Sequence, residues 1–316
     1  MKKKDCNYSI VVYPTEKTEN FPLSFQPFYV AYVNSSIHGE IVLFESDSVY
    51  VCLILRKKLG LKFAHLISEI YSLSDESIDY INFYSSLQAY FSSHHIVALF
   101  PPQHLHNYGV APEKAQFYDL GIINLRLNTS LDNLFLNFKP VYRRHIKSAQ
   151  KDGVEIEIGM HLFDEFYRFY ESRMLLNNAV YDRKEVLQKI VDKAPDHVIC
   201  AIAKMNGKIE AVILNMHNND CAYYMWGASG IDSHNGSFRL LHWVLIQHYH
   251  QLGIKNYSLG GYRLEGNKNK KQENLENFKL GFGASIVQGV HFIWILKPFH
   301  YYLYKKVSLV FQYLRK

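Results

Sequence analysis

Residues 197–229, HVICAIAKMNGKIEAVILNMHNNDCAYYMWGAS, decide the fold because they contain three consecutive apolar runs of strand length. Asn206-Gly207 separates the first two runs, and this pair is the strongest short signal for a two-residue hairpin turn. Asn218-Asn219-Asp220 separates the second run from the third and is typical of a second polar turn. The stretch therefore predicts three antiparallel strands.

The flanking segments place this meander in a longer order of elements. Residues 154–160 alternate between apolar and polar side chains and predict a strand, and helical spacing predicts helices over 161–176 and 183–194. After the meander we expect a helix over 236–253 ended by Gly253, then a strand, a helix and a last strand over 256–261, 274–283 and 285–295. This order resembles the GCN5-related acyltransferase fold.

The first part of the chain predicts a similar mixture of strands and helices. We expect a hairpin over 41–58 turned at Ser46-Asp47-Ser48, a helix over 77–93, strands over 95–102 and 117–127, and a helix over 129–153 kinked or broken at Pro140. The fold class is therefore α/β (α+β), with two GCN5-related acyltransferase-type subdomains and mixed, mostly antiparallel sheets flanked by helices. We place the degenerate N-terminal subdomain at 1–129 and the C-terminal subdomain, with a basic aromatic C-terminal helix, at 130–316.

Composition excludes several classes of protein. With 316 residues, 48% hydrophobic and 20% charged, the chain is typical of a folded globular protein. Its 4 cysteines lie far apart, which suits a reducing compartment, and no apolar run approaches the length of a spanning helix. We expect a cytoplasmic protein. His242, His248 and His250 lie on different faces of one predicted helix, so we expect no metal site.

Positive charge is concentrated at the C-terminus. The formal net charge is +6, and no Asp or Glu occurs from Asn277 to the end of the chain. Residues 294–316 alternate aromatic side chains with lysine and arginine. Such a helix can lie on an anionic membrane surface, which would make the protein peripheral at the inner membrane face, or hold a phosphorylated ligand. The alternative is a packed structural helix with a solvated basic face.

Four blocks in order carry a resemblance to a known family. They are VYRRHIKSAQKDGVEIEI at 141–158, YYMWGAS at 223–229, LGIKNYSLGGYR at 252–263 and NFKLGFGA at 277–284. The chain resembles the Fem peptidoglycan-bridge aminoacyltransferases, the FemAB-like branch of the GCN5-related superfamily, over residues 131–295. The resemblance implies two acyltransferase-type subdomains and transfer of an aminoacyl or other acyl group to an amine, often of a cell-wall precursor. The chain has no room for the coiled-coil arm of some members.

The resemblance also implies a role for Phe278 and Lys279, which occupy the place of a Phe-Lys pair that faces the acyl carbonyl in relatives. Attack of an amine on an ester or thioester puts negative charge on the carbonyl oxygen, and a fixed cation lowers that barrier. The alternative is helix capping, because a lysine in a last turn followed by glycine is typical of a helix end.

The resemblance implies five further positions in the substrate site. Arg183 falls near an arginine that binds the acceptor's phosphate or carboxylate, although Leu187 stands where relatives have a tyrosine. Tyr224 corresponds to a substrate-lining tyrosine and is equally typical of a core strand. The last three positions form a loop over the site: Gly260, Gly261 and Tyr262. In the preceding strand, Ser258 replaces an aspartate that is common in relatives.

The acyl donor is open between aminoacyl-tRNA and acyl-CoA. Residues 232–241, DSHNGSFRLL, contain one glycine where CoA-dependent enzymes have a glycine-rich pyrophosphate loop, which argues against CoA. An RNA donor or a phosphate group needs basic surface, and Arg143, Lys147, Lys151, Lys270 and Lys271 can supply it; the alternative for these residues is an ordinary polar face.

These observations favour an acyltransferase acting on an amine of a cell-envelope precursor or a related polar metabolite, with a membrane-linked precursor and a tRNA donor as candidate partners. One alternative is a CoA-dependent N-acetyltransferase of polysaccharide or lipid biosynthesis. Another is a non-catalytic protein of the same fold that binds a phosphorylated lipid or glycan.

Overall fold

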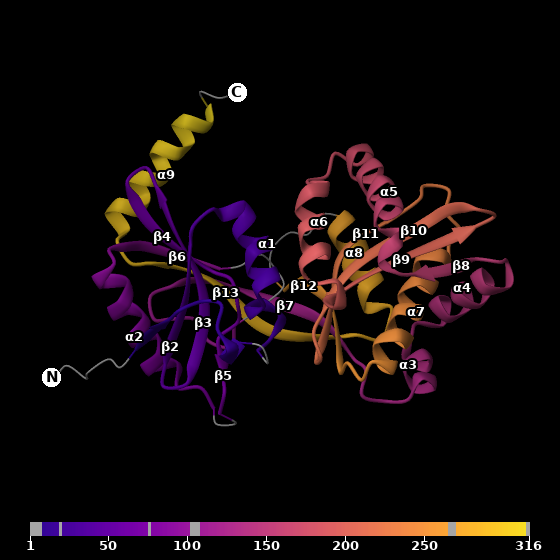
Figure 1. Ribbon diagram of the computed structural model, residues 1–316, viewed down its shortest axis with the longest axis horizontal. Helices are drawn as coiled ribbons and strands as arrows, with labels where there is room; N and C mark the ends of the chain where they lie inside the picture. The colour runs from indigo at the N-terminus through magenta and orange to yellow at the C-terminus, as the bar shows by residue number, and fades with distance from the viewer. Residues whose placement is uncertain (1–7, 19–20, 75–76, 102–107, 265–269, 314–316) are drawn as a thin grey trace. The chain divides into compact units, whose positions relative to one another are not determined.

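The computed structural model describes residues 8–18, 21–74, 77–101, 108–264 and 270–313. The chain forms two compact units, one of residues 1–121 with 288–316 and the other of residues 122–287. Each unit is a mixed sheet flanked by helices (Figure 1). We call them the first unit and the second unit.

The sheet of the second unit contains the predicted meander. Its strands β9 (Val198–Met205), β10 (Lys208–His217) and β11 (Cys221–Ser229) are antiparallel neighbours, and β8 (Glu155–Ile158) extends the sheet beyond β9. Asn206 and Gly207 turn β9 into β10 with φ values of 52° and 74°, as the sequence predicts. β12 (Asn256–Arg263) pairs with β11 in parallel. A parallel pair needs a crossover, and helix α7 (Ser237–Gln251) supplies it.

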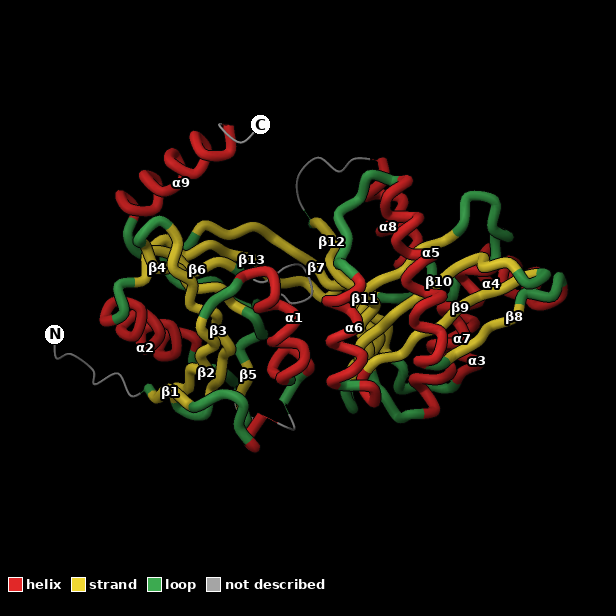
Figure 2. Tube along the Cα trace, turned by 45° about the horizontal axis from the view of Figure 1, so that its top comes forward, coloured by secondary structure: helices red, strands yellow, loops and turns green. Residues whose placement is uncertain are grey.

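Helices cover both faces of this sheet (Figure 2). Alternate residues such as Ile199, Ala201 and Ile213 belong to the core with α7, because successive side chains of a strand point to opposite faces. Helix α5 (Phe163–Leu176) packs on β9, β10 and β11, and α6 (Lys184–Lys193) follows it in the chain. The helix predicted over 129–153 is broken, because Pro140 starts α4 (Pro140–Lys151) after α3 (Leu131–Asn137) has ended at an extended Phe138.

The first unit repeats the same topology. Its antiparallel strands β2 (Glu40–Ser46), β3 (Val49–Lys58) and β4 (Leu61–Leu66) are followed by helix α2 (Tyr80–Ser93) and by β6 (Ile96–Phe100), which is parallel to β4. The predicted pair of acyltransferase-type subdomains is confirmed in this order of elements. β1 (Ser9–Val11) pairs with β2, and β5 (Tyr71–Ser72) pairs with β3. Helix α1 (Pro27–Ile37) and strand β4 were not predicted from the sequence.

The end of the chain belongs to the first unit, whereas the sequence placed it with residues 130–287. Strand β13 (Ser285–Ile295) pairs with β6 through Trp294↔Leu99 and Ile295↔Ala98. Helix α9 (Pro298–Tyr313) buries Tyr301 beside Val97 and Ala98 of β6. The chain also passes from the first unit to the second within β7 (Gln116–Arg126), which lies next to β12 in strand order. Choice of a strand partner depends on contacts distant in sequence, so local patterns do not predict it.

In the part of the chain that the structure describes, no helix has both the length and the apolar character needed to span a bilayer.

Helix α8 (Lys270–Leu280) buries two charged side chains, Glu276 and Lys279. Apolar residues recur at helical spacing at Leu275, Phe278 and Phe282. Leu275 is 50% exposed, whereas Phe278 packs partly on the core and Phe282, just after the helix, is buried. The carbonyl groups at its end are satisfied from another segment: the Tyr142 hydroxyl donates to the Phe278 carbonyl at 3.0 Å. Lys279 is therefore not needed to cap this helix.

Gly281 follows α8 because the Tyr142 ring leaves no room for a side chain. A Cβ atom at Gly281 would lie 2.2 Å from Cζ of Tyr142. Gly281→Ala is expected to lower the free energy of unfolding by about 1–3 kcal/mol through overpacking. Urea unfolding measures this loss. In a Tyr142→Leu background the same substitution should cost much less, and equal costs in both backgrounds would show that the ring is not responsible.

Candidate functional site

The site of the second unit lies where two strands stop pairing. β11 and β12 form three register pairs, Cys221↔Asn256, Ala222↔Tyr257 and Tyr223↔Ser258, and both strands continue beyond them. A bulge in β11 opposite Leu214 and Asn215 of β10 bends the strand at the same level. Backbone groups and side chains past Tyr223 and Ser258 are therefore available to a ligand rather than to the ladder.

Lys279 reaches this region from the inner face of α8. Its side chain is 8% exposed, and a Cβ atom placed on Gly260 of β12 would lie 3.5 Å from its Nζ. Gly260 has a φ of 85°, a left-handed conformation that other residues rarely adopt. Burial lowers the pKa of Lys279 to about 8, and the carboxylate of Glu276 partly opposes that shift. The lysine is thus a cation at neutral pH in surroundings that solvate it weakly.

Aromatic rings pack around Phe278, the residue before Lys279. The Phe278 ring stacks on Phe238 of α7 with a centroid distance of 5.4 Å, and the Arg239 guanidinium lies 4.5 Å from the Tyr142 ring centroid and 5.7 Å from that of Phe278. Such cation–π contacts hold the arginine against the aromatic group. The arrangement fixes the last turn of α8, which carries Lys279.

His242 lies under these rings and is fully buried. Its Nδ1 is 3.0 Å from the hydroxyl of Tyr257, which also accepts a hydrogen bond from Asn215 Nδ2 at 3.2 Å. Among the described residues, Nε2 of His242 has no hydrogen-bond partner. Burial, with the charge of Lys279 as the second cause, lowers the pKa of His242 to about 3, so the imidazole is neutral. From the sequence, His242 was raised only as a metal ligand, and Glu276 was given no role. The position of His242 on the apolar face of α7 is the pattern that could have indicated a buried histidine.

Several residues that the resemblance implied lie around this point. The Tyr224 ring of β11 is half-buried and packs edge-to-face on His242, with a centroid distance of 5.0 Å. A Cβ atom on Gly227 would lie 2.6 Å from the Tyr224 hydroxyl, so the glycine makes room for it. Gly261 and Tyr262 continue β12 from Gly260, and Tyr262 packs partly on the core of the unit.

The other predicted residues lie elsewhere in the second unit. Arg183 is exposed and immediately precedes α6; its neighbour Asp182 accepts a 2.9 Å hydrogen bond from Nε1 of Trp226 on β11. The Arg143 guanidinium donates to the Leu136 carbonyl at 2.6 Å, which gives it a structural role at the end of α3. The remaining four are exposed, on α4 and on the first turn of α8: Lys147, Lys151, Lys270 and Lys271.

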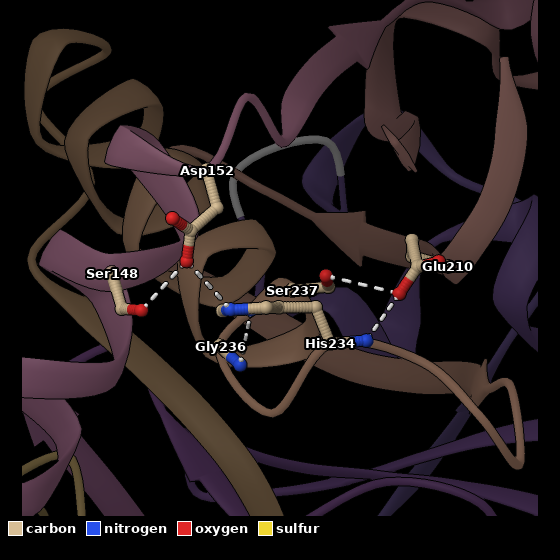
Figure 3. A network of polar contacts seen from close by, with 6 residues as sticks. All are labelled: Ser148, Asp152, Glu210, His234, Gly236 and Ser237. Carbon is tan, nitrogen blue, oxygen red and sulfur yellow. Dashed lines mark hydrogen bonds and ion pairs between the residues drawn. The ribbon is translucent and has the colours of Figure 1, made fainter. Parts of the chain in front are cut away.

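The start of α7, where the fold can bind an anion, is occupied by the chain's own side chains (Figure 3). Glu210, the extra residue of a bulge in β10, accepts hydrogen bonds from the His234 N–H and the Ser237 hydroxyl. The Gly236 N–H donates to Nδ1 of His234, whose Nε2 lies 3.1 Å from Asp152. A carboxylate and an imidazole therefore accept hydrogen bonds from the loop before α7 and from Ser237. In the described part of the chain, no group of three or more His, Cys, Asp or Glu side chains could hold a metal ion.

A family model matches part of the second unit. Residues 137–279 match the model described as an acetyltransferase (GNAT) domain, and the match ends at Lys279. This segment is therefore similar to a GNAT-type domain. No curated protein sequence matches the chain at a significant level.

Solved structures extend the likeness to both units. The fold is similar to that of FemX, with 13% identity, a TM-score of 0.66, and coverage of 86% of this chain and 92% of FemX. It is also similar to the C-terminal domain of a putative lysylphosphatidylglycerol synthetase from Agrobacterium fabrum (13% identity, TM-score 0.54, 84% and 90% covered). L-PGS from Bacillus licheniformis gives 12% identity, a TM-score of 0.54, and 86% and 92% covered. At these identities the likeness concerns the fold alone, and that fold agrees with the resemblance of residues 131–295 to the FemAB-like branch.

The depressed pKa of Lys279 predicts a stability difference that depends on pH. Below about pH 8 the lysine is charged in both the folded and the unfolded chain, so folding bears the full cost of burying the charge. That cost disappears as pH rises from about 8 to 10.5, the ordinary pKa of a lysine in the unfolded chain. Above that pH the lysine is neutral in both states. The wild type should therefore gain stability relative to Lys279→Met across this interval in urea unfolding. A difference independent of pH would contradict the buried, shifted lysine.

Proposed function

We propose that the second unit transfers an acyl or aminoacyl group to an amine and that Lys279 stabilises the reaction at the acyl carbonyl. The observation that carries this proposal is a buried lysine, cationic at neutral pH, beside Gly260 at the divergence of β11 and β12. A cation in a poorly solvated position interacts more strongly with developing negative charge than an exposed one does.

In the proposed reaction, the nitrogen of an acceptor amine attacks the carbonyl carbon of the activated acyl group. The new C–N bond forms while negative charge collects on the carbonyl oxygen, where the Lys279 ammonium opposes it. The C–O bond of an ester donor, or the C–S bond of a thioester, then breaks. The proton that the amine loses ends on the leaving oxygen or sulfur, so no covalent enzyme intermediate is needed.

We further propose that the donor is an aminoacyl-tRNA rather than acyl-CoA. Glu210 accepts hydrogen bonds from the His234 N–H and the Ser237 hydroxyl next to the start of α7, and a carboxylate there repels a pyrophosphate. The exposed lysines of α4 and α8, Lys147, Lys151, Lys270 and Lys271, offer basic surface to an RNA backbone. The proposed acceptor is an amine of a cell-envelope precursor or a related polar metabolite, and the proposed ligand of its phosphate or carboxylate is Arg183, which is exposed before α6. Reactions of this kind take place on the cytoplasmic side, which is where we place the protein.

The catalytic proposal is tested with an acceptor recovered from the purified protein by native mass spectrometry and with bulk aminoacyl-tRNA carrying a labelled amino acid. Lys279→Met is expected to reduce turnover by roughly a hundredfold or more while acceptor binding stays close to wild type. The matched control is Lys189→Met, which removes an exposed lysine on α6. Equal turnover in wild type and Lys279→Met would exclude the role.

The pH profile separates a cationic role from a basic one. If the ammonium form acts, turnover should fall as pH rises through about 8, and Lys279→Arg, which stays charged, should shift that loss to higher pH. A profile that instead rises through the same pH would assign Lys279 as a base.

The donor proposal is tested by isothermal titration with acetyl-CoA. We expect no binding tighter than about 10⁻⁴ M, the range of weak anion contacts. Glu210→Gln removes the repelling charge and should be the variant in which CoA affinity rises. Low-micromolar binding to the wild type together with an N-acetylated product would replace the tRNA donor by acyl-CoA.

A further inference from the structure

The hairpin between β3 and β4 in the first unit carries a dense group of positive charges. Arg56, Lys57 and Lys58 end β3, Lys62 is the second residue of β4, and Leu59 at the turn is 53% exposed. Lys57 and Lys62 are direct register partners, and both are exposed. Like charges directly opposite each other destabilise an antiparallel pair. The hairpin thus keeps an unfavourable arrangement that a bound anion would relieve.

Helix α9 lies against the same hairpin. The Tyr304 ring is 4.6 Å from the Phe63 ring of β4, and Nζ of Lys58 lies 5.6 Å from the Tyr304 ring centroid. Tyr301, which is buried, fixes the first turns of α9 on β6. Figures 1 and 2 show the last turns of the helix projecting past β4 and β6. We call residues 56–62 and the outward side of α9 the hairpin–α9 surface.

The outward side of α9 is apolar as well as basic. Helical spacing places five large side chains away from Tyr301 and Tyr304 together with Lys306, while Lys305, one turn after Tyr301, is exposed at the edge of this side. The five and their exposed fractions are Phe299 77%, Tyr302 48%, Leu303 50%, Leu309 59% and Val310 59%. A contiguous apolar stripe of this kind on one helix is unusual for a surface that faces only water.

A pocket adds further apolar area next to the first turn of α9. It has a volume of about 820 Å³ and is lined on one side by Pro298 and Tyr302 and on the others mainly by Tyr80, Ile81, Tyr84 and Trp294. Tyr302 belongs to both the pocket and the exposed stripe, so the two apolar areas are continuous.

We propose that the hairpin–α9 surface binds the surface of an anionic lipid bilayer. Positive charge alone would suit a nucleic acid equally well, but the exposed apolar side chains of α9 and Leu59 have no role against a phosphate backbone. Lysines beside exposed leucine and phenylalanine are typical of helices that lie in a membrane interface. The sequence supports the sign of the charge, because neither residues 51–68 nor residues 277–316 contain an Asp or Glu. This binding is independent of acyl transfer, and it would bring the chain to a membrane-linked acceptor.

Sedimentation of the full chain with vesicles tests the proposal. The protein should sediment with phosphatidylcholine vesicles that contain phosphatidylglycerol at low salt, and release as salt screens the lysines. Vesicles of phosphatidylcholine alone should retain far less protein. Absence of sedimentation with anionic vesicles at low salt would overturn the proposal.

Charge-reversal variants locate the surface. Each lysine near an anionic bilayer contributes enough that Lys305→Glu with Lys306→Glu should weaken vesicle binding by about thirtyfold or more. Lys189→Glu with Lys193→Glu on α6 makes the same change in net charge and should leave binding nearly unchanged. Equal weakening by both pairs would mean that net charge alone is responsible, which contradicts a defined surface.

Two further variants exclude a folding defect and a nucleic-acid partner. Lys57→Glu converts the like-charge pair with Lys62 into an opposite-charge pair, so it should raise the unfolding midpoint and still weaken vesicle binding. Leu303→Ser with Leu309→Ser keeps every charge and should weaken vesicle binding without affecting retention of bulk tRNA. If this apolar variant binds vesicles as the wild type does, or if tRNA displaces the protein from vesicles in wild type and variant alike, the surface is a nucleic-acid site instead.

Discussion

The parallel pairing of β11 and β12 ends after three register pairs, and the chemistry of the second unit depends on that ending. Up to Tyr223 and Ser258 the two strands satisfy each other's backbone groups. Past these residues β11 bends at a bulge and β12 passes through the left-handed Gly260. The polar inner face of α8 covers the space that follows, which is why Lys279 and Glu276 are buried although both are charged residue types.

Burying a lysine is costly unless its surroundings compensate, and the second unit shows how the cost is limited. Glu276, one turn before Lys279, favours the charged form, while its own carboxylate accepts a 2.9 Å hydrogen bond from the Arg263 N–H. His242 remains neutral beside the lysine, so it adds no repulsion. Asn215 and Tyr257 hold the histidine from below through side-chain hydrogen bonds. These contacts keep a cation in place without an ion pair strong enough to neutralise it.

Both units place a carboxylate at the start of the helix that follows the three-stranded meander. In the first unit, Asp79 accepts a 3.1 Å hydrogen bond from the Asn82 N–H at the start of α2. In the second unit, Glu210 plays this part for the loop before α7, although it comes from a neighbouring strand. A helix start attracts anions through its free N–H groups and its dipole. A carboxylate of the chain itself therefore lies near the start of each helix.

The sequence by itself determined the elements whose signals are local. The Asn206-Gly207 turn, the meander around it, the helix break at Pro140 and the repeated order of elements follow from turn chemistry, proline geometry and apolar spacing. Resemblance drew attention to Phe278 and Lys279 but not to the environment of Lys279. Tertiary structure decided that Glu276 and Lys279 of α8 are buried while Leu275 is exposed, with Lys279 next to Gly260 of β12. It also brought His242 beneath Lys279, assigned β13 and α9 to the first unit, and joined the 56–62 hairpin to α9. These outcomes rest on contacts between residues far apart in the chain, which no local pattern encodes.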